Sequence, residues 1–263
     1  MSTTHPTVLV TGASSGIGAV YADRFARRGH DLVLVARDAP RLQALAARLR
    51  QEAGVQVDVL QADLTAPGDV ERVERRLRED ASIGILVNNA GAVSPGQFLD
   101  QTAGDISGIV ALNVIALTRL ARAAAGRFAA EGQGAIINIA SIVGFAPELG
   151  MTVYGATKAF VLFLSQGLQL ELGPKGVHVQ AVLPAATRTE IWERSGRKVN
   201  DIQGVMDVAE LVDAALVGFD RRETVTIPPL PDAAQFEAFE VARLAMLPNL
   251  RQTHPAARYR SAA

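Results

Sequence analysis

The stretch TVLVTGASSGIG, residues 7–18, decides the fold class of this 263-residue chain. It begins with a β-branched, apolar run and ends in a turn that contains Gly12, Gly16 and Gly18, directly before a segment with helical periodicity. Glycines allow a tight bend and the close approach of a ligand, and the start of a helix offers free N–H groups to a phosphate. This order predicts the first βαβ unit of a parallel sheet, with a phosphate-binding turn.

The same alternation of short β-branched runs and helical segments continues along most of the chain. Such alternation is typical of right-handed βαβ units, which build a parallel sheet. Further strands are predicted at 31–36, 55–63, 83–91, 134–141, 177–184 and 223–228. The fold class that follows is α/β, a single Rossmann-type doubly wound parallel sheet with helices on both faces and a ligand site at the carboxyl ends of the strands.

One dinucleotide-binding catalytic domain accounts for residues 1–263, because no low-complexity linker divides the chain. Residues 184–204 are polar, aperiodic and interrupted by glycine, which predicts a substrate loop over the site. From about residue 231, the segment DAAQFEAFEVARLAMLPNL indicates a C-terminal helical tail.

The composition excludes several classes of function. A formal net charge of −1 argues against an electrostatic nucleic-acid binder, which needs clustered positive charge. The absence of cysteine removes disulfides, thiol nucleophiles and cysteine-type zinc sites, and the four histidines show no paired metal-ligand spacing. We therefore expect no metal site and no nucleic-acid partner.

The chain shows no sequence signal for a membrane or for export. The first residues, MSTTHPTVLVTG, lack the basic and apolar regions of a signal peptide. No apolar stretch reaches the roughly 20 residues that cross a bilayer. Together with the absence of cysteine, which fits a reducing compartment, these features predict a cytoplasmic protein without a membrane partner.

The glycine turn has more than one interpretation. Its spacing, TGxxxGxG, is looser than the dinucleotide fingerprint GxGxxG, so the turn alone could be an ordinary connection. Residues 12–16 also satisfy GxSxG, the nucleophile elbow of hydrolases, with Ser14 as the nucleophile. An elbow normally follows several strands, whereas this turn follows the first. No triad histidine is obvious, although His178 or His254 would satisfy the chain order, and a serine hydrolase stays an alternative.

The second predicted strand ends in LVARD, which bears on the choice of cofactor. An acid at this place holds the adenosine ribose in dinucleotide folds, whereas an arginine nearby accommodates a 2′-phosphate. Arg37 is interpreted as the phosphate ligand. Asp38 competes for the ribose, but its position before Pro40 suits the N-cap of the next helix. The sequence favours NADP over NAD.

The stretch TVYGATKAF, residues 152–160, places Tyr154 and Lys158 four residues apart at the start of an apolar helix. That spacing brings both side chains to one helical face. The chain has only three lysines against twenty-three arginines, so a lysine here is unusual for this protein. Taken alone, the pair could be an ordinary amphipathic rim.

The glycine turn, NNAG at 88–91, Asn113, Ser141 and YGATK at 154–158 together resemble the short-chain dehydrogenase/reductase family, in its compact branch of roughly 250 residues. The resemblance runs from Thr7 to about Ile227. It implies hydride transfer between a nicotinamide cofactor and an alcohol/carbonyl pair, with no metal in the chemistry. It also implies frequent homodimers or homotetramers built through the long helices.

The resemblance implies cofactor contacts along the whole strand edge. Arg37 keeps the role given above, and Tyr154 and Lys158 would also touch the cofactor. The remaining implied residues are Gly12, Ser14, Ser15, Gly16, Ile17 and Gly18 at the turn, Asp63 and Leu64, Asn89, Ala90 and Gly91, and Pro184, Thr187 and Thr189. The family usually writes PGxVxT in the last segment, where this chain has PAATRT.

The resemblance also assigns catalytic roles. Tyr154 would be the general acid and base, with Ser141 holding the substrate oxygen and Asn113 holding a water that links Lys158 to solvent. A free phenol titrates near pH 10. We expect the ammonium of Lys158, one helical turn away, to lower the pKa of Tyr154.

The resulting prediction is an NADP(H)-dependent oxidoreductase that interconverts a carbonyl and an alcohol, acting on a CH–OH group. Two further hypotheses compete with it: an NAD-dependent alcohol dehydrogenase of the same family and a non-catalytic NADP-binding protein. Apolar residues predict a hydrophobic substrate pocket, with Trp192 either its wall or a loop anchor. The pocket residues are Val143, Phe145, Leu149 and Ile191, with Arg194 in the same loop. Ala121, Ala124, Phe160 and Phe163 are predicted to face a second copy.

Overall fold

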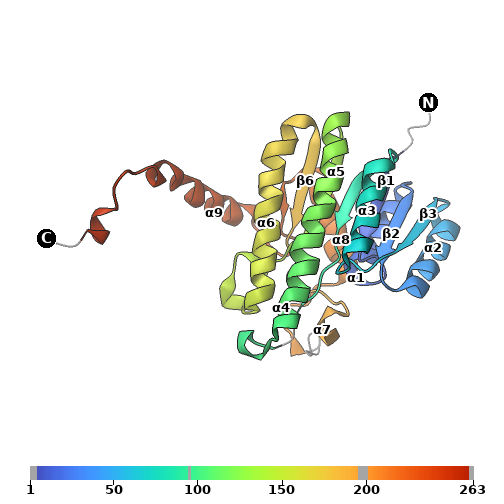
Figure 1. Cartoon of the computed structure of the whole chain (residues 1–263), viewed down its shortest axis with the longest axis horizontal. Coiled ribbons are helices and arrows are strands. Elements are labelled where there is room, and N and C mark those ends of the chain that lie inside the picture. The colour runs from blue at the N-terminus through green and yellow to red at the C-terminus, as the bar shows by residue number, and fades with distance from the viewer. Residues whose placement is uncertain (1–4, 94–95, 195–200, 261–263) are drawn as a thin grey trace. The chain divides into compact units, whose positions relative to one another are not determined.

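Seven parallel strands form one sheet in the described part of the chain, which comprises residues 5–93, 96–194 and 201–260 of the computed structural model (Figure 1). The strand order is β3-β2-β1-β4-β5-β6-β7. The strands are β1 (Thr7–Thr11), β2 (Leu32–Ala36), β3 (Val57–Gln61), β4 (Ile83–Asn88), β5 (Gly134–Ile139), β6 (Val177–Val182) and β7 (Val225–Thr226). The order reverses between β1 and β4, so the predicted doubly wound sheet is confirmed.

Helices cover both faces of this sheet (Figure 1). One face carries α1 (Gly16–Arg27), α2 (Ala39–Ala53) and α8 (Val208–Asp220). The opposite face carries α3 (Pro67–Glu79), α6 (Thr152–Leu172) and a continuous helical run made of α4 (Ala103–Val110), the π-helical segment η2 (Ala111–Ala116) and α5 (Leu117–Glu131). The remaining helices are α7 (Ile191–Arg194), α9 (Ala233–Ala245) and the short 3₁₀ turns η1 (Phe98–Asp100), η3 (Ile142–Gly144), η4 (Pro147–Leu149), η5 (Gly173–Lys175), η7 (Leu247–Leu250) and η8 (Ala257–Tyr259).

The central strands are buried on both faces, which explains their continuous apolar sequence. Side chains alternate between the faces along β1: Val8 and Val10 join the core under α1, α2 and α8, whereas Leu9 joins the core under α3 and α5. This packing holds the carboxyl ends of the strands, and the loops that follow them, at one edge.

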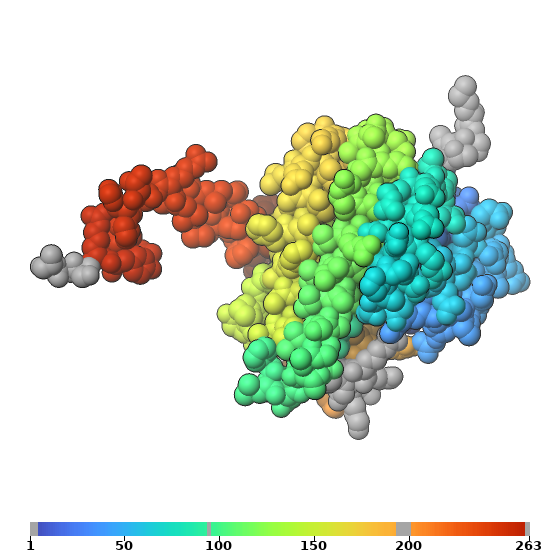
Figure 2. All heavy atoms as spheres, in the orientation of Figure 1, coloured from blue at the N-terminus to red at the C-terminus, as the bar shows by residue number. Residues whose placement is uncertain are grey.

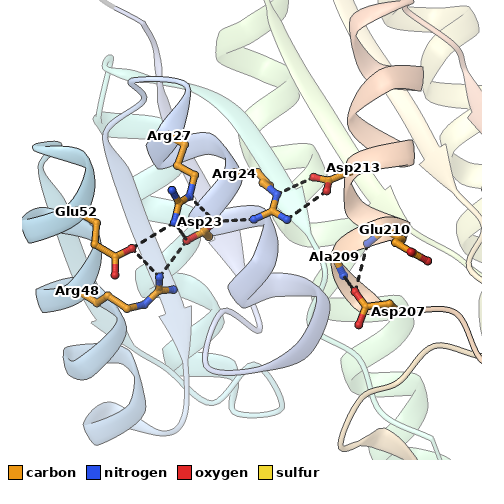
Figure 3. Close-up of polar contacts among 9 residues, drawn as sticks. All are labelled: Asp23, Arg24, Arg27, Arg48, Glu52, Asp207, Ala209, Glu210 and Asp213. Atoms are coloured by element: carbon orange, nitrogen blue, oxygen red, sulfur yellow. Dashed lines mark hydrogen bonds and ion pairs between the residues drawn. The ribbon is translucent and has the colours of Figure 1, made fainter.

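An ion-pair network ties three helices together on the first face (Figure 3). Asp23 of α1 accepts hydrogen bonds from Arg24 and Arg27, and from Arg48 of α2. Arg24 also donates to Asp213 of α8. Although burial raises the pKa of Asp23, these guanidinium hydrogen bonds hold it below its usual value. The network therefore fixes α1 and α2, the helices that follow the first two strands.

The run 103–131 is, among the described helices, the one long and apolar enough to span a membrane by length and composition. The sequence-based expectation that no stretch has this length is thus wrong by that criterion. Core helices also meet this criterion, and Leu120, Ala124 and Phe128 of this run lie in the core between the helix and the sheet.

The structure divides into two compact units, one up to Pro229 and one from Leu230 onward. The division falls close to the predicted start of the C-terminal tail. In the second unit, Asp232 caps α9 by accepting a hydrogen bond from the N–H of Ala234. None of the residues of α9 is buried.

Candidate active site

The glycine turn after β1 forms a backbone cradle. Gly12 and Gly16 have φ of 65° and 54°, in the left-handed region that favours glycine. A Cβ on Gly18 would overlap the carbonyl oxygen of Gly12 and the side chain of Asn89. The helix α1 begins at Gly16, so its free N–H groups point toward any anion held by the turn. A Cβ on Gly12 would also collide with Asn89 and Ala90, so the glycines keep the turn compact, and the free N–H groups at the start of α1 suit a phosphate.

The ends of β1 and β4 are locked together by polar contacts. The Thr11 hydroxyl accepts from the N–H groups of Asn89 and Ala90 at 2.9 and 3.0 Å. The Asn89 side chain donates to the carbonyl oxygens of Thr11 and Gly12 at 2.9 and 3.2 Å. Asn89 thus shapes the turn, and Ala90 and Gly91 line the cavities beside it.

A cavity of about 370 Å³ lies beyond the turn, between the ends of β1, β2 and β3. Its lining includes Arg37, Asp63 and Leu64, which the resemblance implies as cofactor contacts, and Ser14 of the glycine turn. Asp38 accepts from the N–H of Arg41 at 3.0 Å, so the interpretation of Asp38 as the N-cap of α2 is confirmed.

Arg41 is a cavity residue that sequence reasoning missed. It lies in the first turn of α2, beside Arg37. The signal was available: a helix start favours acidic residues, because its partial charge is positive, so an arginine there calls for a separate reason.

The catalytic candidates lie close together where β5 ends and α6 begins. Ser141 follows β5, and its hydroxyl donates to the carbonyl oxygen of Pro184 at 3.1 Å. A Cβ on Gly144 would lie 2.8 Å from the carbonyl carbon of Lys158, so the turn η3 packs directly on α6. Ser141 also hydrogen-bonds the hydroxyl of Tyr154. The structure therefore brings the side chains of Ser141 and Tyr154 together.

The pKa values at this site differ from the sequence-based expectation. Burial raises the pKa of Tyr154 to about 12, against the opposing effect of the Ser141 hydrogen bond. Burial lowers the pKa of Lys158 to about 8. The prediction that Lys158 lowers the pKa of Tyr154 is wrong for this structure. The Lys158 ammonium donates to the carbonyl oxygen of Ile139 at 2.7 Å and lies 5.6 Å from the Tyr154 ring centre.

Asn113 lies in η2 and joins three segments. Its side-chain oxygen accepts from the N–H of Ala92 at 2.8 Å, and its NH₂ donates to the Ala92 carbonyl oxygen and the Thr157 hydroxyl. The side chain thus holds the loop after β4 against α6. The predicted role in holding a water stays a prediction.

A second cavity of about 130 Å³ runs past the glycine turn to Tyr154 and Lys158. It is also lined by Ser15, Ile17 and Thr189. The methyl group of Thr189 lies 3.2 Å from where a Cβ on Gly16 would be. Thr189, just before α7, therefore covers the glycine turn after β1.

A third cavity of about 360 Å³ adjoins Tyr154 and Ser141 and is mostly apolar. Met151, which holds φ of 62° just before α6, lies in its wall. The remaining apolar lining residues are Ile17, Val93, Ile142, Val143, Leu149, Pro184, Ala185, Ala186, Ile191, Trp192 and Ile202. Val143, Leu149 and Ile191 thus lie where the sequence predicts.

The same cavity shows the role of Trp192. Its ring lies in the cavity wall, and its indole N–H donates to the carbonyl oxygen of Thr187 at 2.7 Å. Trp192 is therefore both a wall and a loop anchor. Phe145 is not among the described lining residues, so its predicted place in the pocket is wrong. The Arg194 side chain and residues 195–200 of the predicted loop lie outside the described residues.

Comparison with known proteins identifies the family. The family model described as short chain dehydrogenase matches residues 6–200. The chain belongs to the short-chain dehydrogenase family. This family assignment confirms the predicted resemblance, makes the protein an oxidoreductase and excludes the serine-hydrolase alternative.

Solved structures of this family are similar over nearly the whole chain. A short-chain dehydrogenase from Sphingobium yanoikuyae in complex with NADPH is 67% identical, with a TM-score of 0.96 over 97% of this chain and 100% of that one. A bulky-bulky ketone specific alcohol dehydrogenase from Comamonas testosteroni is 62% identical, with a TM-score of 0.92 over 98% of this chain and 99% of that one.

A curated relative is more distant. A very-long-chain 3-oxoacyl-CoA reductase from Anas platyrhynchos is 34% identical over 190 residues, which cover 70% of this chain. The chain spans about 60% of the length of that relative.

Proposed function

We propose that the protein is an NADPH-dependent reductase that converts a bulky, apolar ketone into the alcohol. The observation that carries the proposal is the apolar cavity of about 360 Å³ whose wall includes Tyr154 and Ser141. A similar protein is described as bulky-bulky ketone specific, which supports this substrate class. NAD-dependent alcohol oxidation is the alternative within the family.

The protein residues would perform the proton chemistry. When bound, NADPH supplies the hydride to the carbonyl carbon. The hydroxyls of Ser141 and Tyr154 would hold the carbonyl oxygen, and Tyr154 would donate the proton as negative charge develops there. A pKa of about 12 keeps Tyr154 protonated at neutral pH, which supports the direction of carbonyl reduction. The pKa of Lys158, about 8, suits proton exchange near neutrality.

The choice of NADPH rests on the guanidinium groups of Arg37 and Arg41, which line the cavity of about 370 Å³. Guanidinium matches the geometry of a phosphate better than an ammonium does. Asp38, which could hold the ribose of NADH, is already the N-cap of α2. The NADPH complex of a similar protein agrees with this choice.

We expect NADPH to bind at least tenfold more tightly than NADH, about 1.4 kcal/mol. Arg37→Ala should remove most of that difference, because the charged hydrogen bond to the 2′-phosphate is lost. A titration of nicotinamide fluorescence measures both affinities. Equal binding of NADH and NADPH by the unchanged protein would instead support the NAD-dependent alternative.

We also propose that two or more copies associate through the outer faces of α5 and α6, which lie side by side (Figure 2). Phe163 and Leu170 of α6 are each 80% exposed, and Phe160 is also exposed. The prediction that Ala121 and Ala124 face a partner is wrong, since both lie in the core.

We expect sedimentation to give a dimer or tetramer, because exposed apolar surface of this kind is stabilised by burial against a second copy. Phe163→Asp should shift the protein toward the monomer. A monomer of 27.8 kDa for the unchanged chain would contradict the proposal.

A further inference from the structure

An ion pair joins the cofactor side of the site to the substrate side. Arg41, in the first turn of α2, donates from Nη1 to both carboxylate oxygens of Glu190 at 2.9 Å. Glu190 directly precedes α7 and lies 149 residues away in sequence. Arg41 lines the cavity of about 370 Å³, and Glu190 lines the narrower cavity of about 130 Å³. The Arg41–Glu190 ion pair thus connects the two cavities.

The proposed cofactor would compete for this contact. Its 2′-phosphate would enter the cavity that contains Arg37 and Arg41. A phosphomonoester has a charge near −2 and three acceptor oxygens, whereas Glu190 has a charge of −1 and two. Arg41 and Glu190 are about half exposed, at 50% and 42%. Exposed ion pairs are weak, so a phosphate can displace the carboxylate.

The cofactor pyrophosphate would also act on Glu190 directly. Ser15 and Gly16 line the same narrow cavity, where the N–H groups at the start of α1 would hold the cofactor pyrophosphate. The Glu190 carboxylate would then lie beside like charges, which repel it.

Glu190 is also mechanically linked to the substrate cavity. Trp192 is two residues away, and its indole N–H holds the carbonyl oxygen of Thr187. Residues 187–192 are therefore closed into one unit by a hydrogen bond. Thr187, Thr189, Ile191 and Trp192 line the apolar cavity, so a displacement of Glu190 reaches its wall.

We propose that the 2′-phosphate of the cofactor replaces Glu190 as the partner of Arg41 and thereby shifts residues 189–192 at the substrate cavity, while Arg188 stays hydrogen-bonded to Met206. The inference rests on the proposed NADPH preference. Arg41 is then a specificity-determining residue, and Glu190 is a positioning residue that makes the substrate cavity respond to the 2′-phosphate.

Two nucleotides that differ only in the 2′-phosphate isolate this effect. Adenosine 2′,5′-bisphosphate and adenosine 5′-monophosphate both lack nicotinamide. Affinity is measured by calorimetry, and the state of residues 189–192 is followed by the fluorescence of Trp192, the only tryptophan of the chain. In the unchanged protein, the bisphosphate should bind about tenfold more tightly and change Trp192 emission, whereas the monophosphate should leave it unchanged.

Variants separate the exchange from simple phosphate binding. Glu190→Gln should bind the bisphosphate about two- to fivefold more tightly, because the competing carboxylate is gone. Its Trp192 emission should already be shifted before addition and change little afterwards. Arg41→Met should weaken bisphosphate binding about tenfold. Glu52→Gln is the matched control, since Glu52 pairs with Arg48 on the same helix at 2.9 Å, with similar exposure. It should behave as the unchanged protein.

The outcomes are distinguishable. If the bisphosphate binds no more tightly than the monophosphate, the proposed NADPH preference is wrong and the exchange is wrong with it. If the bisphosphate binds more tightly, but Glu190→Gln has the affinity and the Trp192 response of the unchanged protein, the exchange alone is wrong.

Discussion

Tyr154→Phe is expected to lower kcat for ketone reduction about a thousandfold while leaving NADPH affinity within about threefold. The substitution removes one hydroxyl and keeps the ring. That hydroxyl contacts Ser141, and both residues line the apolar cavity. The developing alkoxide would lose its proton donor and one of its two hydrogen-bond donors. Steady-state turnover of a bulky ketone and a separate NADPH titration measure the two effects.

The chain offers a matched control in Tyr21. The Tyr21 hydroxyl is fully buried and has no hydrogen-bond partner among the described residues. Tyr21→Phe makes the same chemical change at a residue that lines none of the three cavities described above, and it removes an unsatisfied polar group, so stability should hold or rise. Its kcat should be unchanged. If Tyr154→Phe retains more than a tenth of the original kcat, Tyr154 is not the proton donor.

The strand order and the place of the catalytic candidates follow from local sequence. Parallel strands bring their carboxyl ends to one edge, so Gly12, Asn89, Ser141 and Pro184, each at or near the end of a strand, had to lie close together. The four-residue spacing then fixes Tyr154 and Lys158 on one helical face.

The direction of the Tyr154 pKa shift could not be predicted in this way. Spacing along a helix gives proximity, but the shift depends on burial and on the hydrogen bonds that each group makes. Lys158 donates to the carbonyl oxygen of Ile139 in β5, a contact between two separate elements that spacing along one helix does not predict. The Arg41–Glu190 pair escaped prediction for the same reason, since the two residues are 149 positions apart.

Alanine-rich helices set a second limit on prediction. The helix α5 has small apolar residues around most of its circumference, so periodicity does not say which face meets the sheet. Ala121 and Ala124 are in the core, whereas Phe163 on α6 is exposed. Packing between α3, α5 and the sheet decides this orientation, and that packing is not written in any single segment.

Lys158→Met is expected to lower kcat at least a hundredfold and yet to stabilise the fold at neutral pH. Lys158 is 5% exposed, and within the described part of the chain its ammonium makes one hydrogen bond, to the carbonyl oxygen of Ile139. Because burial lowers its pKa from 10.5 to about 8, the charged form destabilises the native state by up to about 3 kcal/mol. Loss of the Ile139 hydrogen bond offsets about 1 kcal/mol, so the net gain should be about 1–2 kcal/mol.

The lowered pKa of Lys158 determines how the stability gained by Lys158→Met changes with pH. Below pH 8 Lys158 is charged in both the folded and the unfolded chain, and its full cost is present. Between about pH 8 and 10.5 the folded protein carries the neutral amine while the unfolded chain still binds a proton, so the cost declines with rising pH. The stability advantage of Lys158→Met should therefore be largest at pH 7 and nearly absent at pH 10.5, as urea unfolding at each pH would measure.

Lys175→Met, at an exposed lysine, should change neither stability nor kcat. A variant that loses activity and stability together at pH 7 would show that Lys158 holds the fold, whereas the expected result would show a buried charge kept for catalysis at the expense of stability.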